Sequence, residues 1–233
     1  MKKKDMYLIL ILIKLLYRNK RTKDILHLLF LSGIVVWGMF FYEFIYENKK
    51  FSYINSSFVT SLTVVSFIIP ISFSCNIFSF YYSFLKSSFS TAYTEYQLIK
   101  STILYLSISN IVFNLIFLTP LFYFNNELIY LLALVLIGNG LLIPFSMLIS
   151  SVKISFIDLS KSKTYNYSGI NIYIVLLTVL LLGGCCLLFF LSGIIFDEYV
   201  TLPIISGGIS LIMLPIWVKI TTYRLENIKF KFI

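Results

Sequence analysis

Charged side chains are scarce in this sequence of 233 residues. Lys, Arg, Asp and Glu together make up 12% of it, whereas a soluble domain of ordinary composition carries about 25%. Hydrophobic residues make up 59%, and the mean hydropathy is +0.91. With so few charges the chain cannot cover a water-exposed surface, so soluble enzymes and soluble binding domains are excluded. The composition predicts an integral membrane protein.

Catalytic and metal-binding motifs are missing as well. The sequence has one histidine, His27, and three cysteines without a CxxC pair, which are too few ligands for a transition-metal site or a disulfide framework. It has no phosphate-binding GxxxxGK[ST] loop, no HExxH and no GxSxG. Ionisable residues are almost absent from the apolar segments, where ion-coupled carriers usually place them. We therefore expect no enzyme activity, cofactor or metal in this chain.

What is abundant is apolar sequence in segments of about 20 residues, the length that crosses a bilayer. Six such segments cover residues 25–46, 58–80, 101–124, 128–150, 172–196 and 200–217. We predict an all-α membrane domain of six transmembrane helices over residues 25–217, preceded by residues 1–24 and followed by a basic tail, 218–233. Prolines within several segments predict bends. We expect a moving or re-entrant element only at the hairpin between the last two segments.

The distribution of basic residues predicts the orientation of these helices. Apart from Lys49 and Lys50, all 19 Lys and Arg lie in the N-terminal segment, the second-to-third connection, the fourth-to-fifth connection or the C-terminal tail. The positive-inside rule places these regions, and so both termini, in the cytoplasm. The net charge of +9 therefore reflects membrane orientation and not nucleic-acid binding. Frequent Ile, Phe, Tyr, Lys and Asn are typical of a low-GC genome and indicate a bacterial cytoplasmic membrane.

Residues 1–24 have the pattern of a helix lying in the membrane interface. At 100° per residue, four cationic residues share one face and the apolar residues lie opposite. The cations are Lys3, Lys14, Arg18 and Arg21. Such a helix turns its cations toward lipid phosphates. The alternative is a basic tail that only determines the topology.

The connection between the second and third segments also has a helical pattern. Apolar residues recur at the i, i+3, i+4, i+7 spacing of one helical face. They are Leu85, Phe89, Ala92, Tyr93, Tyr96 and Ile99. We predict a short amphipathic cytoplasmic helix here. Such a helix can dock in a groove of a soluble partner or lie on the membrane surface, and the pattern does not separate these alternatives.

The connection between the fourth and fifth segments is polar and ends in a turn signal from Asn166 to Gly169. It is either a second cytoplasmic contact or a solvated connector. The residues of the candidate contact are Asp158, Ser162, Asn166, Tyr167 and Gly169.

Small and amide side chains stand out inside the apolar segments. Asn76, Asn110, Asn114 and Asn139 are expected to form interhelical hydrogen bonds more often than a substrate site. The run from Gly183 to Cys186 predicts close helix packing, with a dimer interface as one use.

Four stretches carry a resemblance to a known family. They are FSFYYSFLKSSF (Phe78–Phe89), YQLIKS (Tyr96–Ser101), IDLSKSKTYNYSG (Ile157–Gly169) and TYRLENIKFKF (Thr222–Phe232). In order and spacing they resemble an uncharacterised family of ABC-2-like permeases from Bacteroidota, of which this chain looks like a half-size member. The six segments, the interfacial helix and the amphipathic connection are likewise similar to the membrane subunits of ABC-2-type exporters.

The resemblance implies a permease subunit that pairs with a second copy or a paralogue. A separate cytoplasmic ATPase would bind ATP and Mg²⁺ and drive the export of an amphipathic or lipid-like cargo. The coupling contacts would be Phe89, Tyr93, Tyr96 and Lys100. A non-transporting scaffold or sensor subunit would have the same composition and remains the alternative. An intramembrane enzyme is a third class, but it would need ionisable residues converging at one depth, and the segments contain none.

Overall fold

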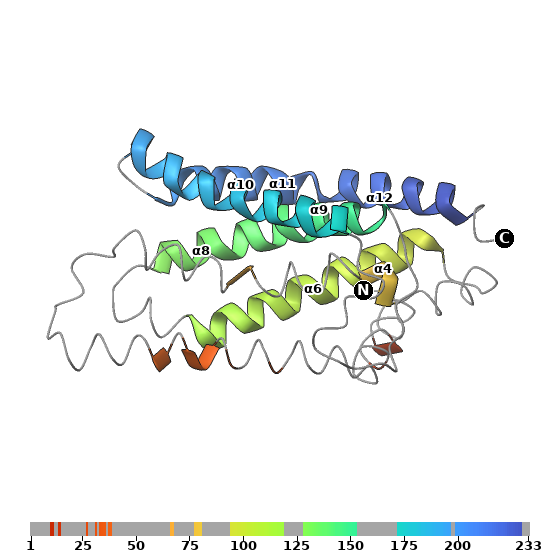
Figure 1. Ribbon diagram of the computed structural model, residues 1–233, viewed down its shortest axis with the longest axis horizontal. Coiled ribbons are helices and arrows are strands. Elements are labelled where there is room, and N and C mark those ends of the chain that lie inside the picture. Colours follow the sequence, from red (N-terminus) through yellow and green to blue (C-terminus); the bar gives the residue numbers. More distant parts are fainter. Residues whose placement is uncertain are drawn as a thin grey trace, which may run out of the picture.

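The computed structural model describes four long ranges of the chain and some shorter ones. The long ranges are 94–118, 128–152, 172–196 and 199–229, and the short ones are 10–11, 14, 27, 31, 33–35, 37–38, 66–67 and 77–80. The elements of these ranges are helices: α4 (Ile77–Phe80), α6 (Glu95–Phe117), α8 (Leu128–Ile137), the π-helix η1 (Gly138–Leu142), α9 (Ile143–Ser150), α10 (Ile172–Phe196), α11 (Thr201–Ile212) and α12 (Leu214–Lys229) (Figure 1).

Several of these helices are long and apolar enough to cross a membrane. Three pass by length and hydropathy, namely Glu95–Ile116, Leu128–Ser150 and Leu176–Phe196. A fourth span is formed if α11 and α12, which are bent by 60° at their junction, cross together. The protein is therefore an all-helical membrane protein with three to four spans in its described part. The predicted segments at 25–46 and 58–80 lie mostly outside the described residues, so the count of six stays a prediction.

The span made of α8, η1 and α9 lies at the centre of the bundle. In the 18-residue stretch of this span that is apolar enough to cross a membrane, 61% of the residues are buried, against 17% in the corresponding stretch of α10. Helix α11 packs on α8 and η1, whereas α12 packs on α9 and α6. The starts of α6 and α10 lie at the same end of the bundle as the ends of α9 and α12 (Figure 1). This alternation fits a chain that crosses back and forth, and the side that faces the cytoplasm stays a prediction.

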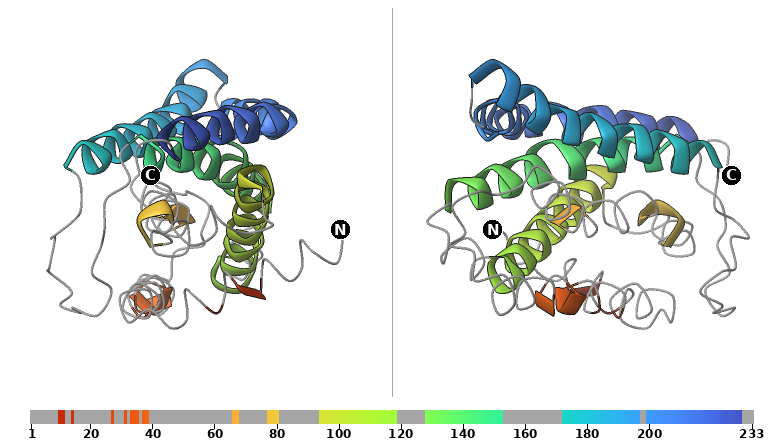
Figure 2. Two further views of the ribbon diagram at one scale, coloured as in Figure 1. Left: turned by 90° about the vertical axis from the view of Figure 1, so that its right-hand side faces the viewer. Right: turned by 60° about the vertical axis from the view of Figure 1, so that its left-hand side comes forward.

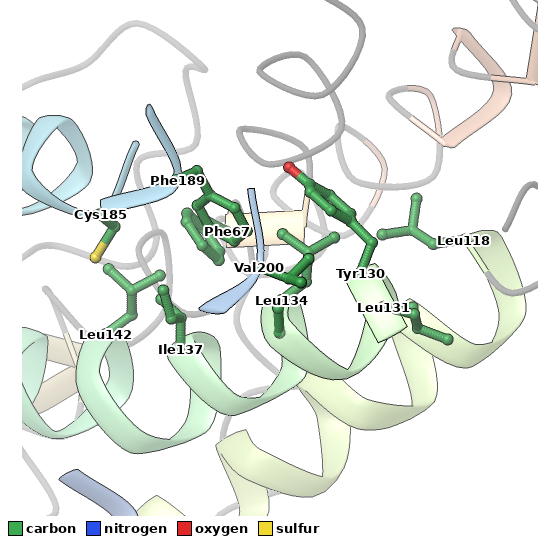
Figure 3. Close-up of a cluster of buried hydrophobic side chains, with 11 residues drawn as sticks. Phe67, Leu118, Tyr130, Leu131, Leu134, Ile137, Leu142, Cys185, Phe189 and Val200 are labelled. Atoms are coloured by element: carbon green, nitrogen blue, oxygen red, sulfur yellow. The ribbon is translucent and has the colours of Figure 1, made fainter. Parts of the chain in front are cut away.

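An apolar cluster joins α8 to α10 at the other end of the bundle (Figure 3). The rings of Tyr130 and Phe189 lie 5.3 Å apart between centroids and are tilted by 43°. Around them are buried Phe67, Leu118, Leu131, Ala133, Leu134, Ile137, Leu142, Cys185 and Val200. Aromatic and branched side chains pack densely, so this end is held by an apolar core.

Two predicted boundaries differ from the structure. Residues 95–99, the described end of the predicted amphipathic helix, belong to the same helix as the span after them, because α6 runs from Glu95 to Phe117. The earlier residues of that prediction, 85–93, lie outside the described residues. Thr94 caps this helix in a reciprocal capping box with Gln97, through bonds of 3.3 and 3.4 Å. The sixth span begins at Thr201, close to the predicted start, but the residues expected to form a tail are helical through Lys229.

Candidate functional site

The predicted coupling residues that the structure describes lie on the first two turns of α6. Tyr96 is 42% exposed and Lys100 is exposed as well. They are four residues apart and therefore share one face of the helix. Leu98, on the opposite face, is buried. Ile99 is also buried, although its spacing predicted that it would share one face with the exposed Tyr96. Phe89 and Tyr93, the other two predicted coupling residues, lie outside the described residues.

Most of the other predicted contact residues also lie outside the described part of the chain. Those of the fourth-to-fifth connection are Asp158, Ser162, Asn166, Tyr167 and Gly169, and those of the N-terminal segment are Lys3, Arg18 and Arg21. Lys14 is described as helical and exposed, which agrees with a cation on the outer face of a helix.

Helix α12 brings further exposed residues to the helix that carries Tyr96. Its buried face follows the i, i+3, i+4, i+7 spacing and consists of Val218, Thr221, Thr222 and Leu225. Because α12 packs on α6, the remaining face leaves Tyr223 68% exposed and Arg224 exposed beside it. The prediction of a basic tail over residues 218–233 missed this surface, although the apolar spacing is present in the sequence.

Three of the predicted intramembrane asparagines come together between α6 and η1. The Nδ2 of Asn110 donates to Oδ1 of Asn139 at 3.0 Å. The Nδ2 of Asn114 donates to Oδ1 of Asn110 at 3.0 Å and to the Asn110 carbonyl at 2.8 Å. All three side chains are buried. The expectation of an interhelical hydrogen bond is therefore confirmed for Asn110 and Asn139, and Asn76 lies outside the described residues.

Asn139 lies in a π-helix, and the sequence explains why the helix is irregular there. The stretch GNGLLIP places two glycines and Pro144 inside an apolar span. Pro144 has no N–H, so it cannot donate to the carbonyl four residues earlier, that of Gly140. One bond of the wider π type is formed instead, from the Ile143 N–H to the Gly138 carbonyl. Such π segments occur often at functional sites.

The carbonyl of Gly140 is satisfied from the neighbouring span. The hydroxyl of Ser210, on α11, donates to it. The same hydroxyl oxygen accepts a bond of 3.2 Å from the indole Nε1 of Trp217, on α12. The Trp217 ring in turn packs on Phe145 of α9, with 4.4 Å between centroids. A chain of contacts thus runs from the π-helix across the bend between α11 and α12.

The bend itself also follows from a proline. Helix α11 ends at Ile212, and Pro215 is the second residue of α12. Because Pro215 offers no N–H to the carbonyl of Leu211, the helix cannot continue through it. Prolines within the apolar segments predicted bends, and this one lies between α11 and α12, next to Ser210 and Gly140. The moving or re-entrant element predicted at the hairpin of the last two segments stays a prediction.

The backbones of α11 and the central span touch at two glycines. A Cβ added to Gly207 would lie 2.7 Å from the carbonyl carbon of Leu136, and one added to Gly140 would meet the carbonyl oxygen of Gly207. This is the close packing that small residues allow. The sequence predicted it at Gly183 and Gly184 instead, but a Cβ at either position would meet no atom within 4 Å. Their proposed use in a dimer interface stays a prediction.

Two polar atoms close to this junction are buried without a hydrogen-bond partner. They are Oδ1 of Asn114, on α6, and Oγ of Ser146, near the start of α9. A buried polar group without a partner costs about 1–3 kcal/mol. Among the described residues no three His, Cys, Asp or Glu lie close enough to hold a metal ion.

We call this arrangement the mid-span junction and define it by Asn110, Asn139, Gly140, Gly207, Ser210 and Trp217. It contains amides, a hydroxyl, an indole and backbone carbonyls, but no group that titrates near neutral pH. Such a set can hold helices together and rearrange, and among these six residues there is no base beside Ser210 that would activate its hydroxyl. Glycine and proline inside one apolar run are the sequence signal that could have located it.

The fold and the junction define a class: a helical membrane protein whose central span is interrupted and bonded to a bent neighbouring span. The chain belongs to the DUF5687 family, a family of unknown function whose model matches residues 8–233. No curated protein and no solved structure matches the chain. Membership of the family covers nearly the whole chain and brings no assigned activity with it.

Proposed function

We propose that this chain is the membrane-spanning permease subunit of an ATP-driven exporter of the ABC-2 type. It would lie in a bacterial cytoplasmic membrane with six spans and both termini inside, and pair with a second copy or a paralogue. A separate cytoplasmic ATPase would hydrolyse ATP with Mg²⁺, and the cargo would be amphipathic or lipid-like.

The observation that carries the proposal is the geometry of α6. This helix has exposed Tyr96 and Lys100 near its start and Asn110, bonded to Asn139, further along. The 14 residues between Tyr96 and Asn110 correspond to about 21 Å of uninterrupted helix. A force on the exposed end would therefore reach the mid-span junction through one rigid element that is capped at Thr94.

The need for a partner follows from the residues of the spans. Carriers driven by ions or protons place ionisable side chains within the bundle. The described parts of the spans contain no Asp, Glu, Lys or Arg between residues 101 and 218. An energy source outside the membrane domain fits this composition, and closure of an ATPase pair against α6 would supply it.

The experiment is to purify the tagged chain from its native membranes in mild detergent and to identify the bound proteins by mass. We expect an ABC ATPase to be recovered. Tyr96→Glu would put an unpaired carboxylate into the buried contact, so recovery should fall roughly tenfold or more, and stimulation of ATP hydrolysis should be lost.

A matched control is available on another helix at the same end of the bundle. Tyr173, at the start of α10, is 69% exposed, and Tyr173→Glu introduces the same charge away from α6. This variant should recover the ATPase as the unchanged chain does. If neither the unchanged chain nor Tyr173→Glu retains an ATPase under conditions that preserve known transporter complexes, the permease proposal fails. Recovery of a kinase or a protease instead would favour a scaffold or sensor subunit.

A further inference from the structure

We propose that the π-helix η1 and the bend between α11 and α12 together form one hinge, about which two halves of the membrane domain move. The first half consists of α8 and α11, with the apolar cluster of Tyr130 and Phe189. The second half consists of α9 and α12, with the start of α6. The hydrogen bond between Asn110 and Asn139 acts as the latch of this hinge. The proposal goes beyond the exporter function and holds whichever partner drives the motion.

The division into halves follows from the packing. Helix α11 packs on α8, η1 and α10, and α12 packs on α6 and α9 (Figure 2). The unbroken helices α6 and α10 contact both halves, since α6 also packs on α8 and α10 also packs on α9. Each helical pair is therefore continuous within a half, and both spans are interrupted where the halves meet. Pro144 interrupts the central span and Pro215 the final one. The central and final spans run in the same direction, and their breaks lie side by side where Ser210 bonds to Gly140. Two such breaks allow bending about a common line, with the second half sliding along the unbroken helices α6 and α10, whereas a single break would be held straight by the neighbouring span.

The two halves are also packed in different ways. The α8 half is held by aromatic and branched side chains, including Phe67, Tyr130 and Phe189. The α9 half buries hydroxyl-bearing residues, which are Ser101, Thr102, Ser146, Ser150, Ser151, Thr221 and Thr222. Several of these hydroxyls bond only to a carbonyl of their own helix, as in Thr102 with Leu98 and Thr222 with Val218. Such bonds survive when one helix slides on another, so the second half can move without losing them.

The links across the junction suit a moving joint. Gly140 and Gly207 bring two backbones into contact, and a Cβ on Gly140 would lie 3.1 Å from Cγ of Leu211, so Leu211 is the side chain that rotation there must pass. The carbonyl of Gly140 accepts a bond from Ser210, and Pro144 has no N–H to donate to it, so bending does not break a regular helical bond between these two residues. Oδ1 of Asn114, on α6, and Oγ of Ser146, on α9, are buried without hydrogen-bond partners. These two atoms can gain partners in a second arrangement, which lowers its relative free energy.

The test measures distances between pairs of spin labels on the chain alone, reconstituted in lipid nanodiscs after the native cysteines are replaced by alanine. One pair joins the halves and has labels at Ile129 of α8 and Tyr223 of α12. The other pair, Ile129 and Ile212 of α11, lies within one half. All three positions are exposed. We expect two distances for the pair that joins the halves and a single narrow distance for the pair within one half.

Three substitutions identify the hinge as the cause. Asn139→Leu removes the latch and should change the ratio of the two populations roughly threefold, the effect of one average interhelical hydrogen bond in lipid. Pro144→Ala returns an N–H to the central span and should narrow the distribution to one distance. Ser192→Ala removes a buried bond of 3.2 Å to the Leu202 N–H, away from the junction, and should change neither pair.

The proposal is overturned if the distance distribution of the label pair across the halves is as narrow as that of the pair within one half. This must hold in both the unchanged chain and Asn139→Leu. The pair within one half reports whether each variant is folded. If Asn139→Leu does not fold, Ser210→Ala opens the other link of the same junction and is measured in its place. Because this measurement contains no ATPase, its result is independent of the recovery experiment. Two distances here together with no recovered ATPase would refute the exporter function and leave the hinge standing.

Discussion

The contact between Gly207 and the central span makes a sharp prediction for a single methyl group. In Gly207→Ala, the new Cβ would lie 2.7 Å from the Leu136 carbonyl carbon, 2.8 Å from the Ile137 nitrogen and 2.9 Å from the Leu136 oxygen. Non-bonded carbon atoms are most stable about 3.5–4.0 Å apart. Because all three neighbours are backbone atoms, the only relief is for α11 to move away by roughly 1 Å.

Two energy terms follow from that movement. Overpacking of this kind costs about 1–3 kcal/mol. The displacement also stretches the bond from Ser210 to Gly140, and an interhelical bond in a membrane is worth about 0.6 kcal/mol. Alanine is favoured over glycine inside a helix by about 1 kcal/mol, which offsets part of the loss.

Gly208 is the matched control because it is the next residue of the same helix. A Cβ at Gly208 would meet no atom within 4 Å, so Gly208→Ala gains the same helix propensity without the clash. Propensity therefore cancels when the two variants are compared. We expect Gly207→Ala to be less stable than Gly208→Ala by about 2–3 kcal/mol.

The assay is equilibrium unfolding in mixed micelles with increasing denaturing detergent, followed by far-ultraviolet circular dichroism. Both variants and the unchanged chain are measured under the same lipid and detergent conditions. Equal stability of the two variants would refute the reasoning, because it would mean that α11 does not touch the backbone of the central span at Gly207.

Two further predictions concern side chains that make hydrogen bonds, Ser210 and Thr94. Ser210→Ala removes the acceptor of the Trp217 indole N–H and the donor to the Gly140 carbonyl, so we expect the free energy of unfolding to fall by about 0.6–1.7 kcal/mol. The Trp217 fluorescence maximum should also shift, measured with Trp37→Phe as background. An unchanged spectrum would mean that the indole makes no such bond. Thr94→Ala removes the capping box of α6 and should cost about 1 kcal/mol, seen as faster hydrogen exchange over residues 95–99 with no change in α10; equal exchange in both proteins would contradict the cap.

Much of the helical outline could be predicted from the amino-acid sequence. The segments at 128–150 and 172–196 match helical spans with nearly the same bounds, because an uninterrupted apolar run of the right length has no other stable state in a bilayer. The sequence also indicated that Asn110 and Asn139 bond between helices, since a buried amide in an apolar bundle needs a partner.

The residues of the mid-span junction depended on the tertiary structure. Gly183 and Gly184 look like a packing site in the sequence, but Gly140 and Gly207 make the close contact. Likewise Ser210 becomes important only because Pro144 releases the carbonyl of Gly140 within its reach. Apolar length and helical periodicity are properties of one segment, and the sequence by itself determines them. The neighbour that a given helical face meets depends on how all the spans pack, and only the tertiary structure decides that.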